Sequence, residues 1–240
     1  MPPVRSSFWQ WPLLAVLSAS PAFAATATVP IDIGVGPAAY WFFGPLTDNR
    51  GAMPHFGLKI NLLAVIDQET IKANRDRIPA NYRKMAEKMT EVRISPSIFI
   101  PESFIISPKV DALGGTGVYG VTWRPLGVGI PLLGGAKPGS WQKSSTSIDL
   151  KAGLLITYAF IYSDYLPTTH FIRPGLDLCL EIEAMASKSF GISFGWASQI
   201  YIPQKLGEFG INVRPLEESI FHVGQAFLKL HFRTPYEASF

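Results

Sequence analysis

The sequence predicts an all-β fold: an antiparallel transmembrane β-barrel of about eight strands with a short periplasmic helical insertion. Three observations predict it: a recurring alternation of apolar and polar residues, an export signal, and an apolar composition without a spanning helix. The alternation is clearest in 170–185, where Ile172 and Leu178 are among the apolar even positions and Arg173 and Glu181 among the charged odd ones. Successive side chains of a strand leave opposite faces. A soluble antiparallel strand shows the same pattern over fewer residues, whereas recurring runs of about ten residues are typical of strands between lipid and a polar lumen.

Residues 1–24 have the three parts of a Sec-type signal peptide. Arg5 supplies a positive charge, 13–17 form an apolar core, and the Ala-Phe-Ala that ends at Ala24 gives the cleavage pattern. The apolar core is too short for a spanning helix and has the wrong flanks. We therefore expect export, cleavage after Ala24, and one domain over 25–240.

The composition agrees with a chain that faces lipid. Hydrophobic residues make up 48% and charged residues 16%, with a mean hydropathy of +0.20. That charged share is below the ~25% of soluble domains, yet no run beyond residue 24 reaches the about 18 apolar residues of a membrane helix. Cys179 is the only cysteine, so an intramolecular disulfide is excluded. The net charge of +3 comes from scattered residues, and we expect no nucleic-acid partner.

Strands can be assigned along most of the chain. Seven segments alternate clearly: 28–44, 55–67, 117–133, 148–163, 170–185, 190–202 and 225–233. An eighth strand is needed because barrels of this kind have an even number, and 92–107 is the best candidate, although Pro96 and Pro101 weaken it. Within 117–133 the apolar phase changes near Arg124 and Pro125, which predicts a β-bulge.

Eight strands also predict the two ends of the barrel. The turn at 187–189 then lies on the periplasmic side, and the longer connections around 44–54, 107–116 and 205–219 lie outside. Aromatic residues near strand ends predict interfacial girdles. They are Tyr40, Trp41, Phe42, Phe43, Tyr158, Phe160, Tyr162 and Tyr201.

Residues 68–91 do not alternate and predict a helical insertion. Ile78, Tyr82, Met85 and Met89 recur at helical spacing among several basic residues. An amphipathic basic helix can lie on an anionic membrane surface or cap the barrel mouth. The alternative is a solvated helix that docks through these four apolar side chains. A periplasmic partner of this segment is a further expectation.

The carboxyl terminus carries a family resemblance. The chain ends in Phe240, with Tyr236, Phe232, Leu230 and Leu228 at positions of the same parity. Together with the alternation, this ending resembles the small bacterial outer-membrane β-barrel proteins, above all the eight-stranded ones. The resemblance covers nearly all of 25–240. It implies an outer-membrane location in a Gram-negative cell, contact with outer-membrane lipids, and assembly by the barrel-assembly machinery through the last strand.

The polar faces of the predicted strands carry charges of both signs. The predicted lumen-facing network is Asp32, Lys59, Asp149, Lys151, Arg173, Asp177, Glu181, Glu183, Lys229, His231 and Arg233. Buried charges have to be paired or hydrated, and an eight-stranded barrel holds only side chains or one small ligand. The network is therefore either structural or a selective path for a small solute.

The sequence assigns no catalytic residue, metal site or cofactor. His170 beside Asp164, and Ser219 beside His222, are the only suggestive neighbourhoods, and neither has the nucleophile, base and acid that a hydrolase needs. The positive neighbours of His231 predict a neutral imidazole. Outer-membrane lipid A deacylases are similar in size and architecture, but their His-x-Ser pairing is absent.

We therefore expect an outer-membrane barrel with a structural or interaction role, or limited small-solute passage. The alternative is a lipid-modifying enzyme, an acyl hydrolase of lipid A or phospholipid.

Overall fold

A computed structural model describes residues 26–43, 55–66, 68–88, 91–95, 100–109, 115–134, 145–163, 169–187, 189–202 and 221–239. Its elements are β1 (Thr26–Phe43), β2 (His55–Ile66), α2 (Gln68–Ala73), η1 (Arg75–Arg77), α3 (Ala80–Ala86), β3 (Val92–Ser95), β4 (Pro101–Ser107), β5 (Thr116–Gly134), β6 (Ser145–Ser163), β7 (Thr169–Met185), β8 (Phe190–Tyr201) and β9 (Phe221–Ser239). The predicted signal peptide and Phe240 lie outside the described residues.

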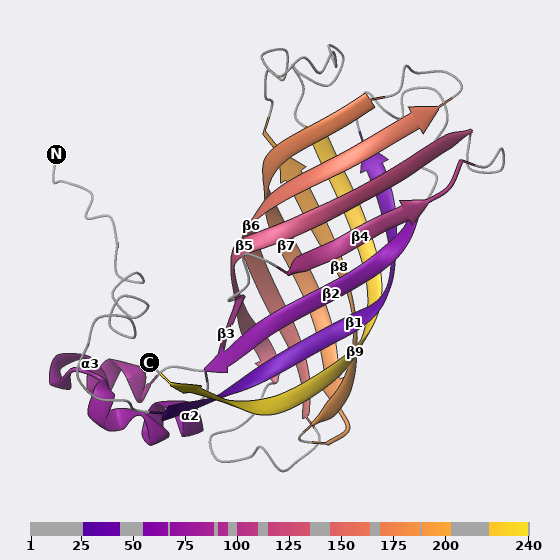
Figure 1. Cartoon of the computed structure of the whole chain (residues 1–240). Coiled ribbons are helices and arrows are strands. Elements are labelled where there is room, and N and C mark those ends of the chain that lie inside the picture. The colour runs from indigo at the N-terminus through magenta and orange to yellow at the C-terminus, as the bar shows by residue number, and fades with distance from the viewer. Residues whose placement is uncertain are drawn as a thin grey trace, which may run out of the picture.

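The strands form one closed antiparallel sheet (Figure 1). Apart from β3 and β4, strands that follow each other along the chain pair, and β1 also pairs with β9 over most of its length, which closes the ring. β3 and β4 both lie between β2 and β5, so they are two halves of one interrupted strand. The barrel therefore has eight strand positions, and the predicted strand over 92–107 is confirmed. The residues between Ser95 and Ile100 lie outside the described part of the chain.

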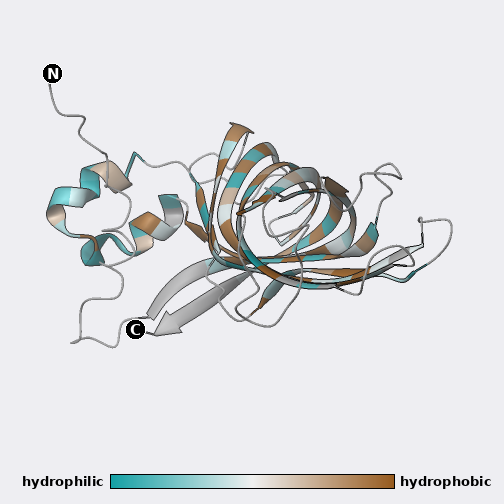
Figure 2. Ribbon diagram, turned by 90° about the horizontal axis from the view of Figure 1, so that it is seen from above, coloured by the Kyte–Doolittle hydropathy of each residue, from teal (hydrophilic) through white to brown (hydrophobic). Residues whose placement is uncertain are grey.

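Hydrophobic and hydrophilic residues alternate as bands along the strands (Figure 2). The large exposed side chains of the strands are apolar, whereas the buried ones include most of the charged residues. On β7 the side chains of Leu176, Leu178 and Leu180 are 49–54% exposed on the outside, whereas Asp177 and Glu181 between them are buried. The predicted alternation is confirmed. This is the arrangement of a transmembrane β-barrel.

The predicted bulge in β5 is also confirmed. Trp123 pairs with Ile156 and Leu126 with Leu154, so β5 has one more residue than β6 at this point. Two further shifts, between Pro131 and Leu133 of β5 and between Pro101 and Ser103 of β4, were not predicted. Each shift reverses the facing of the residues beyond it.

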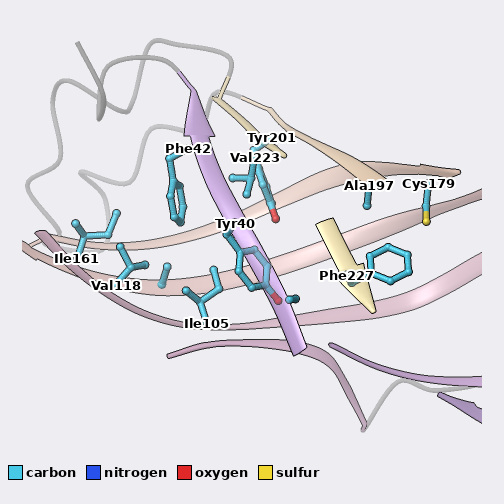
Figure 3. Packing of buried hydrophobic residues seen from close by; sticks show 12 residues of the cluster. Tyr40, Phe42, Ile105, Val118, Ile161, Cys179, Ala197, Tyr201, Val223 and Phe227 are labelled. Atoms are coloured by element: carbon cyan, nitrogen blue, oxygen red, sulfur yellow. The ribbon is translucent and has the colours of Figure 1, made fainter. Parts of the chain in front are cut away.

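The prediction of interfacial girdles was wrong for three aromatic residues. Tyr40, Phe42 and Tyr201 point inward and are buried, because they share the parity of the inner face. They belong to an apolar cluster in the lumen that includes Phe227 and Ile105 (Figure 3). By contrast, the predicted girdle residues Trp41, Phe43, Tyr158, Phe160 and Tyr162 lie partly or largely exposed.

The connection between β2 and β3 is helical, inside the predicted insertion 68–91. It contains α2, η1 and α3 and lies at the end of the barrel where β1 begins and β9 ends (Figure 1). Ile71 and Ala86 are its buried apolar residues, whereas Met85 is 44% exposed. Of the four side chains through which the helix was expected to dock, Met85 is therefore not buried, Ile78 and Tyr82 are partly exposed, and Met89 lies outside the described residues. None of the helices in the described parts of the chain has the length and apolar character to cross a membrane.

Candidate functional site

The structure places the predicted lumen charges on the inner face of the barrel. Period-two alternation turns them inward from five strands, and every one is buried. They are Asp32 on β1, Lys59 on β2, Asp149 and Lys151 on β6, Arg173, Asp177, Glu181 and Glu183 on β7, and Lys229, His231 and Arg233 on β9.

Arg93 is the centre of the charged network nearest the helices. Its guanidinium donates to Glu91 and to Asp149, each at 2.7 Å, and also to Glu183. Arg233 donates from Nε to Asp32 at 3.0 Å and contacts Glu183 through Nη2. Two arginines therefore bond four carboxylates, which come from β1, β6, β7 and the residue before β3.

The Glu181 carboxylate forms ion pairs with two lysines. Lys151 lies 2.8 Å from it, and Lys229 lies 3.0 Å from it. Lys229 also donates to the Asn61 side chain at 2.6 Å. Because Asn61 is on β2, these contacts tie together β2, β6, β7 and β9 across the barrel.

A third group lies farther from the helices. Lys59 is 2.8 Å from Glu102, which also accepts from Arg124, and Arg124 in turn contacts Asp177. Lys59 donates to Gln225 at 2.6 Å. The ammonium groups of Lys59 and Lys229 lie 4.9 and 4.7 Å from the ring centre of Phe227.

The apolar cluster follows on the loop side of this group. Gln225 donates to the Tyr40 hydroxyl at 2.7 Å, so a polar residue connects the charged layer to the aromatic one. Similarly, the Tyr201 hydroxyl lies 2.7 Å from the Thr157 hydroxyl, within hydrogen-bond distance. In Figure 3 the apolar side chains of Phe42, Val118, Ile161 and Tyr201 come from strands on several sides of the ring.

The buried Asp, Glu, Lys and Arg side chains of the described residues are equal in number of each sign, and the ring of His231 lies among them. Among the described residues seven acidic and seven basic side chains are buried, apart from His231. The basic ones are Lys59, Arg93, Arg124, Lys151, Arg173, Lys229 and Arg233, and the acidic ones are Asp32, Glu91, Glu102, Asp149, Asp177, Glu181 and Glu183. Charge neutrality and mutual pairing are the conditions under which buried charges are tolerated.

Sequence reasoning missed four members of this network. Arg93 was detectable, because it has the opposite parity to Ile94 in the predicted eighth strand. Arg124 lies at the bulge, where parity is undefined. Glu102 has the parity of the outward Phe104 but turns inward because of the register shift beside it. Glu91 precedes β3 and was placed in the insertion.

Ser193, His231 and Asp32 have the connectivity of a hydrolytic triad. The Ser193 hydroxyl lies 2.6 Å from His231 Nε2, and Nδ1 lies 2.8 Å from Asp32. However, Nε2 also faces Glu181 at 3.2 Å. A ring with a carboxylate at each nitrogen suits imidazolium, which donates from both nitrogens and cannot serve as the base for Ser193.

His231 also corrects the prediction of a neutral imidazole. Its neighbours along β9, Lys229 and Arg233, are two residues away, whereas Asp32 and Glu181 reach its ring from β1 and β7. The charges nearest the His231 ring therefore come from the neighbouring strands and not from its own strand.

Three side chains of kinds that can bind a metal ion lie together in the same region. Ligand atoms of Asp32, Glu183 and His231 lie within 4.8 Å of one another. Arg233 already bonds both carboxylates, and Arg93 also bonds Glu183. A cation there would have to displace these guanidinium groups, so the arrangement suits an ion-pair network.

The other histidines lie near the loop end of the strands. His55 Nδ1 is 3.0 Å from the Ser107 hydroxyl, and His170 Nδ1 is 2.9 Å from the Tyr158 hydroxyl. His222 stacks on Phe43, with ring centres 4.9 Å apart. Asp164 and Ser219, the predicted neighbours of His170 and His222, lie outside the described residues.

No protein-family model matches the sequence, and no curated protein matches it. Similar solved structures include Neisserial surface protein A, with a TM-score of 0.48, 10% identity, and coverage of 84% of this chain and 96% of that chain. Ail, the attachment invasion locus protein of Yersinia pestis, has a TM-score of 0.39 and 10% identity, with coverage of 86% and 99%. Its complex with the heparin analogue sucrose octasulfate has a TM-score of 0.37. The fold of this chain rests on its own strand pairings.

Proposed function

We propose that this protein is an outer-membrane β-barrel that acts as a closed scaffold with a structural or interaction role. The observation that carries the proposal is the network of buried lumen charges, in which every buried carboxylate of the described residues forms an ion pair with a lysine or arginine. The signal sequence and the apolar outer belt support the outer-membrane location.

A solute path would require this network to open. Arg93 would have to leave three carboxylates, and Lys151 and Lys229 would have to leave Glu181. Breaking one buried ion pair costs about 3–5 kcal/mol, because the remaining charge is left uncompensated. The apolar cluster beyond the charged layer is a second barrier to ions. These features favour a closed scaffold over small-solute passage.

Interaction would use the two ends of the barrel. At the end opposite the helices, β1, β4, β6 and β8 end and β2, β5, β7 and β9 begin. Connections on a rigid scaffold are where proteins place binding residues, so this end is the proposed outer contact surface. At the other end, β9 is the proposed signal for the barrel-assembly machinery.

Planar-bilayer recording of the refolded protein tests the closed lumen. We expect no steady conductance. Glu181→Gln and Lys229→Met disturb the network, and Leu180→Ala is the matched control, because Leu180 is the outward-facing neighbour of Glu181 on β7. Steady conductance of the wild type that changes with Glu181→Gln but not with Leu180→Ala would establish a channel.

Mass spectrometry of lipid A and phospholipids, before and after expression, tests the enzyme alternative. We expect unchanged acyl chains. Loss of an acyl chain that is restored by His170→Ala, His222→Ala or Ser193→Ala would overturn the scaffold proposal in favour of an acyl hydrolase.

A further inference from the structure

The helical connection between β2 and β3 carries the excess charge of the protein. Residues 68–88 contain six basic and three acidic side chains, a net charge of +3 that equals the net charge of the whole chain. The described interior of the barrel, by contrast, has as many buried carboxylates as buried lysines and arginines together. The basic character is therefore concentrated on one small external element.

This element lies beside the barrel. Seen from above, α2 and α3 lie outside the ring of strands and do not cover its opening (Figure 2). Seen from the side, they lie at the level where β2 ends and β3 begins (Figure 1). A helical element in this position lies next to the edge of the apolar belt, where lipid headgroups surround a membrane barrel.

Specific contacts hold the element together. α2 contacts β1, with Ile71 buried. Asn74 donates to the Thr70 carbonyl at 2.8 Å, and Arg83 donates to the Ile78 carbonyl at 2.9 Å. Arg75 pairs with Glu87 at 3.2 Å, which ties η1 to the end of α3.

The remaining surface combines positive charge with an apolar side chain. Lys72, Arg77, Lys84 and Lys88 are exposed. Met85 is exposed between Lys84 and Lys88. An apolar side chain flanked by basic residues is the pattern of an interfacial element on anionic lipid.

We propose that this basic helical element, residues 68–88, lies on the headgroups of the leaflet at its own end of the barrel and binds anionic phospholipid there. Met85 enters the interface while the lysines contact the phosphates. The inference rests on the proposed membrane location of the barrel. It assigns the insertion a lipid partner in place of a soluble one or a mouth-capping role.

The test uses the full chain, refolded into phosphatidylcholine vesicles with or without phosphatidylglycerol. An environment-sensitive fluorophore is attached at Met85→Cys. The matched control is Ala80→Cys, five residues earlier and so on the other side of the helix. The buried native Cys179 is checked by labelling the unsubstituted protein. Both leaflets have the same composition, so the orientation of insertion does not matter.

We expect the label at position 85 to blue-shift when phosphatidylglycerol is present and to revert in high salt, since salt screens surface charge. The label at position 80 should not shift. Lys84→Gln with Lys88→Gln should abolish the response, and Asp76→Asn should strengthen it. Retained heat-modifiable migration in gels shows that each variant is folded.

Equal emission at position 85 in both lipids would overturn the proposal. So would a response that survives the paired lysine substitutions. A label at Leu178→Cys separates this failure from that of the membrane barrel. If position 178 reports lipid and position 85 does not respond, the lipid contact alone is wrong. If position 178 reports water, the proposed location is wrong.

Discussion

At the scale of single residues, the fold depends on which face each side chain takes. Asp177 and Leu178 are adjacent in the sequence, yet one is buried in the lumen and the other is exposed on the outer belt. The charge of Asp177 is compensated by Arg124 from β5. A strand residue therefore contacts either the outer surroundings of the barrel or the ion-pair network of the lumen. A substitution on the outer face changes the exposed apolar surface, whereas a substitution on the inner face removes an ion pair.

Leu178→Arg should destabilise the barrel by about 2–4 kcal/mol if it lies near the bilayer midplane, because a charge would then face hydrocarbon. Asp177→Asn should act through Arg124 and leave the outer face unchanged. Urea unfolding in vesicles measures both effects. Spin labels at 176, 177, 178 and 179 provide the control: accessibility to an apolar relaxant that fails to alternate would contradict the strand assignment.

At the scale of elements, the seam between β1 and β9 closes the barrel. The two strands pair from Thr26 with Ser239 to Phe43 with His222. Gly36 lies where the backbones approach closely: a Cβ there would overlap the Leu228 carbonyl oxygen and lie 2.8 Å from Lys229 Cα. The absence of a side chain at this position is thus required by the neighbouring strand.

Gly36→Ala should lower the free energy of unfolding by about 1–3 kcal/mol, the usual cost of overpacking. Gly34→Ala is the matched control on the same strand, because its Cβ would meet only the side chain of Asn61, at 3.0 Å. Thermal shifts of heat-modifiable migration measure both. An equal loss in the two variants would show that close backbone approach is not the cause.

The helical connection provides the second prediction at this scale. Replacement of 68–88 by a short Gly/Ser turn should leave a folded barrel, because the strands supply the closed hydrogen bonding that a membrane requires. Replacement of 68–91 should be less stable, since it also removes Glu91, which pairs with Arg93 at 2.7 Å.

Gel migration and urea unfolding compare the two deletions. Failure of the shorter deletion to fold would show that the helices are part of the barrel core. Equal stability of the two would show that the contact between Glu91 and Arg93 contributes nothing measurable.

At the scale of the whole molecule, the apolar belt makes sense only for an exported chain. We expect the protein purified from membranes to begin at Ala25, because residues 1–24 have the parts of a signal peptide. Amino-terminal sequencing determines the start. A chain that retains Met1 or Pro2 would contradict export by this route.

The sequence predicts the faces of this barrel well because a strand repeats every two residues. The pattern around Leu178 predicted its outward position, and the phase change at Arg124 predicted the bulge. The interrupted strand over 92–107 followed from the even strand number. Facing and bulge position depend on residues close together in the sequence, and the eighth strand follows from the even number of strands. All three can therefore be predicted without a structure.

Only the tertiary structure decided which charges meet. Arg93 binds Asp149 and Glu183, which lie 56 and 90 residues away along the chain. Likewise, His231 is placed between two carboxylates, and Glu102 turns inward at a shift that its own sequence does not reveal. Alternation determines the face of a residue, but its partners depend on strand order, register and closure of the ring, and these are set by pairings between distant segments.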